Sequence, residues 1–346
     1  MRPRITLRNK TGSVRPSIAA AFLLLAGFAQ AQTSSPSPAW PFGTPAGSPT
    51  PAPADLDQPP ARDIPLVEVP WDQLSNKEVG EDGEKALAIK PERWKHAETD
   101  NFIVHYRRAT EAHKVVREIE YDLWFVAKTL GATPAQYRRK SHVFVFEDEN
   151  EWKIFLEQTS APLWAGSFAY RDELFLSVRH MESGGQFDSH TLAHETTHAV
   201  VARLYPFEHW PVWLNEGFAE YMGSASVATR NHLYLKNVER NLANAGMPLD
   251  EMFALKRYPT DEDKVAQLYQ TGEKFVRFLM TVLPKERFRQ FVTAILAANA
   301  PQKTAGATSS EGSSASTSVE SVFMQIYGDK FKSFDDFKKK FDAFSK

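Results

Sequence analysis

The stretch that decides the fold of this 346-residue chain reads His194-Glu195-Thr196-Thr197-His198. On a helix, residues four positions apart project from one face, so both histidine imidazoles can reach one tetrahedral Zn²⁺. Glu195 lies beside them without having to bind the metal, and its carboxylate can take a proton from a water that the metal activates. The pattern therefore predicts a helix that carries a catalytic metal site.

A second polar element supplies the third ligand that such a site needs. Seventeen residues, 199–215, separate the second histidine from Glu216, and Glu216 belongs to the stretch Trp213-Leu214-Asn215-Glu216-Gly217-Phe218-Ala219-Glu220. An open catalytic zinc site uses three protein ligands and leaves the fourth position to water. Together the two elements predict a ligand set of His194, His198 and Glu216.

Other residues near the motif are weaker alternatives for the third ligand. Glu208 and His209 lie between the two expected helices, where metal binding is the less favoured alternative. His180 and His190 lie just upstream, and we interpret both as surface histidines.

Cysteine is absent, which excludes disulfides, thiolate zinc ligands and a cysteine nucleophile. The 41 basic and 43 acidic residues give a formal charge of −2. Removing an expected leader with five basic residues leaves 36 basic against 43 acidic ones, a charge near −7. This balance gives no support for nucleic acid or an anionic membrane as a partner.

Residues 1–31 have the pattern of a signal peptide. Five basic residues precede the apolar run 18–29, and Ala29-Gln30-Ala31 is a suitable small-residue cleavage site after Ala31. The run is short for a membrane span and no second long apolar stretch follows, so no stable membrane insertion is expected after cleavage. We expect export to the periplasm or the medium, with an uncleaved signal anchor as the alternative.

The rest of the chain divides into three parts by composition and periodicity. Residues 32–93 are expected to form a disordered linker rich in proline, serine and alanine, with folded sequence beginning near Trp94. Residues 94–225 show mixed periodicity and predict an α/β subdomain. Its expected strands are 101–106, 142–146, 166–170 and 173–178, and its expected helices are 111–130, 149–158, 190–204 and 211–223, the last begun by proline and stopped by glycine.

Residues 226–346 predict a mainly helical C-terminal subdomain without internal repeats. The expected helices are 230–245, 264–283, 286–299, 319–327 and 334–344. Residues 300–318 are rich in serine, alanine, threonine and glycine and are expected to form a flexible insertion. The fold class is therefore α+β: a small mixed sheet packed on the helix of the metal motif, followed by helices.

The two polar elements resemble the gluzincin metallopeptidases, the superfamily of thermolysin and aminopeptidase N. The clearest likeness covers about 30 residues, with a weaker likeness in element order over 99–283. The resemblance implies a zincin-like fold, Zn²⁺ held by His194, His198 and Glu216, and Glu195 as general base. The metzincin class is excluded, because Val201 and Leu204 stand where it places glycine and histidine.

Two further residues take roles from the same resemblance. Glu220 matches a carboxylate that hydrogen-bonds a ligand histidine. Tyr269-Gln270-Thr271-Gly272 resembles the aminopeptidase Tyr-x-Lys-Gly element, whose tyrosine stabilises the tetrahedral intermediate. An exposed glutamate and a packing tyrosine are the alternatives for these two positions.

The chain also departs from the aminopeptidases in two ways. The spacer 199–215 is one residue shorter than theirs, and no Gly-Ala-Met-Glu-Asn element, which grips a free α-amino group, is present. We therefore expect an exported zinc metallopeptidase acting on a peptide or protein substrate, an endopeptidase rather than an aminopeptidase. Addition of the substrate backbone to strand 166–170 or 173–178 is one interpretation of these strands, and a strand that only completes the core sheet is the equal alternative. The alternatives are a noncatalytic envelope binding or assembly protein and a zinc hydrolase of another amide or acyl bond.

Overall fold

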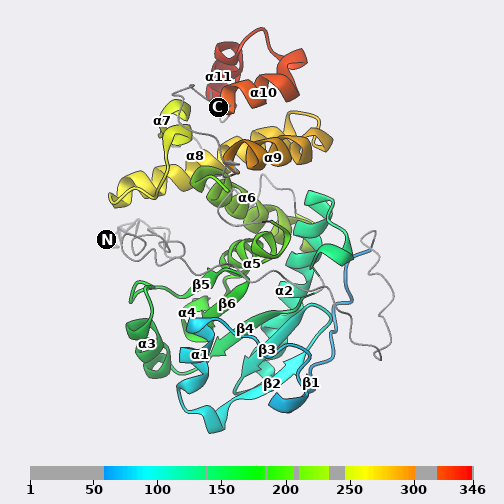
Figure 1. Cartoon of the computed structure of the whole chain (residues 1–346), viewed down its shortest axis with the longest axis vertical. Helices are drawn as coiled ribbons and strands as arrows, with labels where there is room; N and C mark the ends of the chain where they lie inside the picture. Colours follow the sequence, from blue (N-terminus) through cyan, green and yellow to red (C-terminus); the bar gives the residue numbers. More distant parts are fainter. Residues whose placement is uncertain are drawn as a thin grey trace, which may run out of the picture.

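The computed structural model describes residues 58–137, 139–183, 186–205, 210–233, 246–300 and 318–344. A sheet with its helices forms one end of the molecule and a stack of helices forms the other (Figure 1). The helices α5 (Ser189–Leu204) and α6 (Val212–Arg230) lie between the two ends. The predicted signal peptide and most of the predicted insertion 300–318 lie outside the described residues.

The sheet is mixed, as the sequence predicted, and has six strands in the order β1-β2-β3-β4-β6-β5. Its central strands β3, β4 and β6 run parallel, and the outer pairings are antiparallel. The strands are β1 (Val67–Glu68), β2 (Lys95–Glu98), β3 (Phe102–Tyr106), β4 (Ser141–Phe146), β5 (Ser167–Tyr170) and β6 (Glu173–Ser177). Strand β5 is therefore an edge strand, and it packs beside α5.

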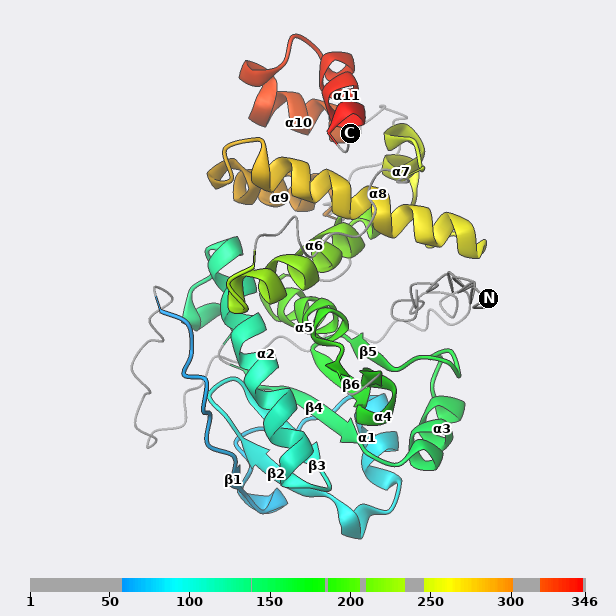
Figure 2. The same cartoon turned by 180° about the vertical axis from the view of Figure 1, so that it is seen from behind.

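Each face of the sheet buries a separate set of side chains. One face contributes residues such as Val104, Val143 and Leu176 to a core with α2 (Ala109–Leu130) and α5. The other face contributes aromatic residues such as Phe144 to a core under α1 (Glu81–Ala88) and α3 (Glu149–Gln158). Figure 2 shows these helices and the sheet from the opposite side to Figure 1. Because strand side chains alternate between faces, strands buried on both sides read as continuous apolar runs.

Three histidines form a hydrogen-bonded row across the second face. His96 Nδ1 lies 2.8 Å from His105 Nδ1, and His105 Nε2 lies 2.9 Å from His142 Nδ1. They come from β2, β3 and β4, and His105 and His142 are almost fully buried. We call this group the sheet histidine row.

The N-terminal boundary predicted at Trp94 is wrong, because folded structure extends back to β1. Strand β1 pairs with β2, and α1 buries Ala86 in the core beneath the sheet. The N–H of Gly80 donates to Glu173 Oε1 at 2.7 Å, which ties the start of α1 to β6. These contacts are made by residues far apart in sequence, so the polar composition of this segment did not reveal them.

Helix α6 crosses α8 (Glu262–Thr281) at a pair of glycines. A Cβ on Gly217 would lie 2.5 Å from the carbonyl carbon of Gly272, so the two backbones can approach this closely only without side chains. Gly223 does not end α6, as the sequence had suggested, since the helix continues to Arg230. A Cβ at Gly223 would lie 2.9 Å from the carbonyl oxygen of His190, so this glycine also permits a close helix contact.

The predicted helix 230–245 is wrong at its start, because α6 ends at Arg230 and residues 231–232 turn; residues 234–245 lie outside the described part. The remaining helices are α7 (Leu249–Ala254), α9 (Glu286–Asn299), α10 (Val319–Tyr327) and α11 (Phe334–Ala343). Phenylalanines pack between them, including Phe323 and Phe337 with ring centroids 4.2 Å apart. Within the described residues, every helix is too short or too polar to cross a bilayer.

Candidate metal centre

Helix α5 carries the His-Glu-Thr-Thr-His motif in a buried position between the sheet and α6. Its first turn is capped by Asp188, whose side chain accepts the backbone N–H of Thr191 at 3.0 Å. The hydroxyls of Thr196 and Thr197 donate to the carbonyls of Leu192 and Ala193 at 2.8 and 2.7 Å. The two middle positions of the motif can therefore be buried without leaving polar groups unsatisfied.

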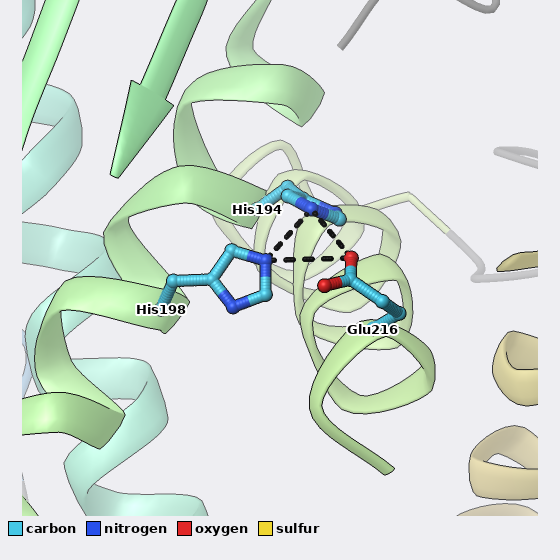
Figure 3. A group of neighbouring side chains, drawn as sticks. All are labelled: His194, His198 and Glu216. Carbon is cyan, nitrogen blue, oxygen red and sulfur yellow. Dashed lines mark hydrogen bonds and ion pairs between the residues drawn. The ribbon is translucent and has the colours of Figure 1, made fainter. Parts of the chain in front are cut away.

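The structure brings His194, His198 and Glu216 together at one point between α5 and α6 (Figure 3). The two Nε2 atoms lie 3.0 Å apart, and each lies 3.5 Å from Glu216 Oε2. Nitrogen and oxygen ligands at zinc-bond lengths of about 2.0–2.1 Å in a tetrahedron lie about 3.3 Å from one another. The three ligand atoms thus have the spacing that one Zn²⁺ requires.

Neighbouring side chains hold both imidazoles in the orientation that metal binding needs. Glu220 Oε1 lies 3.2 Å from His194 Nδ1, and Asn215 Oδ1 lies 3.3 Å from His198 Nδ1. An acceptor at Nδ1 keeps the proton there and leaves the lone pair of Nε2 free for a metal. Glu220 therefore stands where the resemblance placed it, and Asn215 is a further orienting residue of the same motif.

Glu195 lies between the metal ligands and the edge strand β5. Its Oε2 accepts the backbone N–H of Ala169 at 2.9 Å, and the residue is 4 % exposed. Burial raises the pKa of this carboxyl, while the neighbouring His194 and His198 lower it. A hydrogen bond from β5 thus holds the Glu195 carboxylate beside the cluster of His194, His198 and Glu216, of which it is not a member.

The charge of the centre fits a bound cation. Glu195, Glu216 and Glu220 are all buried, and Glu216 and Glu220 form ion pairs with histidines. Burial alone would lower the pKa of His194, but hydrogen bonds to Glu216 and Glu220 raise it well above its usual value. Burial alone would raise the pKa of the Glu216 carboxyl, but His198 and His194 hold that pKa far below its usual range. Three carboxylates buried near one another are stabilised by a positive charge between them.

Tyr269 of α8 reaches the same centre from the other side. Its ring stacks on that of His194 with centroids 5.9 Å apart and an interplanar angle of 16°. Burial, and then the charge of Glu216, raise the pKa of its hydroxyl well above the usual value. The crossing of Gly217 and Gly272 holds α8 close enough to α6 for this contact.

Sequence reasoning missed one contact of the centre and misplaced another. The hydroxyl of Tyr258, from the segment between α7 and α8, donates to Glu216 Oε1. No spacing to either motif could have revealed it, because only tertiary packing brings this segment to the ligand. His190 is not a surface histidine: its Nε2 lies 3.6 Å from Glu220 Oε2 and its side chain is 16 % exposed.

The other rival ligands stand apart from the centre or outside the described residues. His180 is exposed, and its Nδ1 lies 3.1 Å from Ser177 Oγ. Glu208 and His209 fall in the undescribed residues 206–209. Among the described residues, His194, His198 and Glu216 are the one group of three or more such side chains placed to share a metal.

Comparison with known proteins agrees with this geometry. A search of curated proteins found no match. Residues 165–311 match the Peptidase family M1 domain, a stretch that begins just before β5, includes α5, α6 and α8, and ends beyond α9. Peptidases of that family are zinc-dependent. The match places the chain in the gluzincin group of zinc metallopeptidases, with the aminopeptidase N-like and thermolysin-like enzymes, and the protein is therefore a metallopeptidase.

Proposed function

We propose that the protein is exported, binds one Zn²⁺ through His194, His198 and Glu216, and hydrolyses internal peptide bonds of a peptide or protein substrate. The observation that supports this most strongly is the spacing of 3.0–3.5 Å among the three ligand atoms. Two imidazoles and one carboxylate form a ligand set typical of catalytic zinc, although such a set also accepts cobalt or manganese.

The chemistry assigned to the side chains follows from their positions. When bound, Zn²⁺ supplies a Lewis acid that polarises the carbonyl and lowers the pKa of a water ligand to about 7. Glu195 then takes the proton of the attacking water and passes it to the leaving amine, since it lies beside the ligands and its burial raises its affinity for a proton. Tyr269 donates a hydrogen bond to the developing oxyanion, a contact that contributes about 3–4 kcal/mol in comparable sites.

Strand β5 supports the preference for internal peptide bonds. As an edge strand beside Glu195, it can pair with an extended substrate backbone. Its residues Ser167-Phe168-Ala169-Tyr170 include no carboxylate to bind a free α-amino group. The nearby Glu173 lies on β6 and accepts the N–H of Gly80, so it is occupied in the core. An amino terminus thus has no counter-ion on this strand.

Export is part of the proposal and rests on the sequence. The leader-like residues 1–31 support a protein that works in the periplasm or the medium. Peptide or protein substrates are the expected partners, and the absence of a basic aromatic surface pattern argues against nucleic acid.

The test compares wild-type protein with Glu195→Gln and a matched surface variant, Glu262→Gln. Glu195→Gln keeps all three ligands, so we expect zinc to remain at one per chain while peptide cleavage falls at least about 100-fold. Glu262 begins α8 and is exposed, so its variant should behave as wild type. Amino-terminally blocked and free versions of one peptide mixture, with and without chelator, report the position of cleavage.

Each outcome has a definite meaning. Cleavage of blocked peptides that is lost with chelator and in Glu195→Gln supports the proposal. Cleavage confined to free amino termini would show an aminopeptidase. Zinc at one per chain without cleavage of any peptide would instead support the noncatalytic protein or the hydrolase of another bond.

A further inference from the structure

We infer that Tyr258 is a positioning residue that fixes Glu216 as a metal ligand through a single oxygen. The inference rests on the proposed function, because it requires Glu216 to bind the metal. Tyr258 lies in the segment between α7 and α8, outside both sequence motifs and eleven residues before Tyr269.

The two oxygens of Glu216 face different surroundings. Oε2 lies 3.5 Å from the Nε2 atoms of both ligand histidines and is the oxygen that points to the metal position. Oε1 accepts a hydrogen bond from the Tyr258 hydroxyl and lies 3.4 Å from Asn215 Nδ2. The carboxylate is therefore held at one oxygen by donors and is free to bind a cation with the other.

This arrangement controls how many positions the ligand can fill. A carboxylate without a second partner can swing both oxygens toward one cation and occupy two coordination positions. A phenol donor on Oε1 opposes that rotation and keeps three protein ligand atoms in place. The remaining position then stays available for the water and substrate on which Glu195 acts.

The two tyrosines differ in what they contact, which separates their roles. Tyr269 stacks on the ring of His194, a contact that a phenylalanine would keep, and its hydroxyl also interacts with Glu216. Tyr258 reaches Glu216 through its hydroxyl, and a phenylalanine would remove the hydrogen bond to Oε1. Tyr269→Phe is the comparison for Tyr258→Phe, because it deletes the same atom at the same centre from the tyrosine that the proposed function assigns to the oxyanion.

The experiment measures zinc affinity by competition with a chelator, the visible spectrum of the cobalt-substituted protein, and peptide cleavage. In Tyr258→Phe we expect zinc affinity to fall about 10- to 100-fold, the usual range for losing a partner of a metal ligand. We also expect weaker visible cobalt absorption, because a second carboxylate oxygen enters the coordination sphere. Tyr269→Phe should lose less zinc affinity than Tyr258→Phe and should lose mainly kcat.

Thermal unfolding of the zinc-loaded variants separates positioning from a purely structural role. If Tyr258→Phe lowers the midpoint but keeps wild-type zinc affinity and cobalt spectrum, the inference is overturned and Tyr258 only packs. If wild-type protein itself fails to bind zinc or to cleave peptides, the proposed function falls instead. A Tyr269→Phe variant that loses zinc as strongly as Tyr258→Phe would also contradict the distinction drawn between them.

Discussion

Two groups of buried or partly buried histidines lie on opposite faces of the sheet and differ in their neighbours. The sheet histidine row, His96, His105 and His142, is linked by hydrogen bonds between the imidazoles themselves. The pair His194 and His198 on α5 meets the carboxylates of α6 instead. Similar burial of the same residue type thus leads to two different electrostatic states.

The pKa values show how the neighbours decide the outcome. In the row, burial lowers the pKa of His142 to about 4 and that of His105 well below its usual value, since a buried cation is poorly solvated. At His194, burial acts in the same direction but Glu216 and Glu220 overcome it. A buried histidine therefore does not by itself indicate a cation site, whereas a buried histidine facing carboxylates does.

Neutralising Glu216 should have the largest effect. Glu216→Gln removes the charged ligand that distinguishes the pair from the row, so we expect zinc affinity to fall at least about 100-fold and cleavage to be lost. Zinc titration with chelator competition measures the change. The control is His105→Gln in the row, which should leave zinc stoichiometry unchanged. Loss of zinc in that variant would show that the row also binds metal.

The second-largest effect should be the pH dependence of stability that the sheet histidine row causes. The pKa of His142 is lower in the folded chain than in the unfolded one, so the unfolded chain binds more protons below about pH 6.5. Stability from this group is present above pH 6.5 and is lost as the pH falls toward 4, by about 2 kcal/mol at pH 5.

Urea unfolding of wild type and His142→Gln at pH 7.5 and pH 5 checks this prediction. Subtracting the stability loss of the variant from that of wild type removes the contribution of groups that titrate elsewhere. The charged or titratable neighbours that act on His142 are Asp172, Arg139, Glu98 and His96. We expect the variant to lose less stability between the two pH values. Equal losses in both proteins would mean that His142 takes up a proton without disturbing the row.

The smallest effect should come from Glu220, which touches a ligand and not the metal position. Glu220→Gln keeps an acceptor near His194 Nδ1 but removes a charge, so we expect zinc affinity to fall about 10-fold. Stopped-flow zinc release to a chelator would measure it. His190→Gln is the matched control, since His190 lies near the other oxygen of Glu220. Unchanged release in Glu220→Gln would show that the charge has no influence on the ligand.

Sequence patterns predicted the helices and strands that depend on residues close together in the chain. The spacing of His194 and His198 sufficed to place a helix there, and the apolar run 143–146 sufficed for β4. Helix α1 was missed because only Asp82, Gly83 and Ala86 are buried, and its anchor Glu173 lies far along the chain. Tyr258 was missed for the same reason, since the packing of α7 and α8 brings its loop to Glu216. The prediction that α6 ends at Gly223 was wrong, because the sequence does not distinguish a glycine that permits a close helix contact from one that ends a helix.

The residues of the centre come from two segments of the chain, which meet at the crossing of Gly217 and Gly272. The metal ligands and the base all lie within residues 194–216, whereas both tyrosine hydroxyls come from residues 258–269. The glycine contact joins these two segments through helix backbones alone. A bulkier residue at either glycine would push α8 away and withdraw the hydroxyls while leaving the ligand triad intact. A single small substitution would thus remove both hydroxyls together and leave a ligand set that holds zinc more weakly.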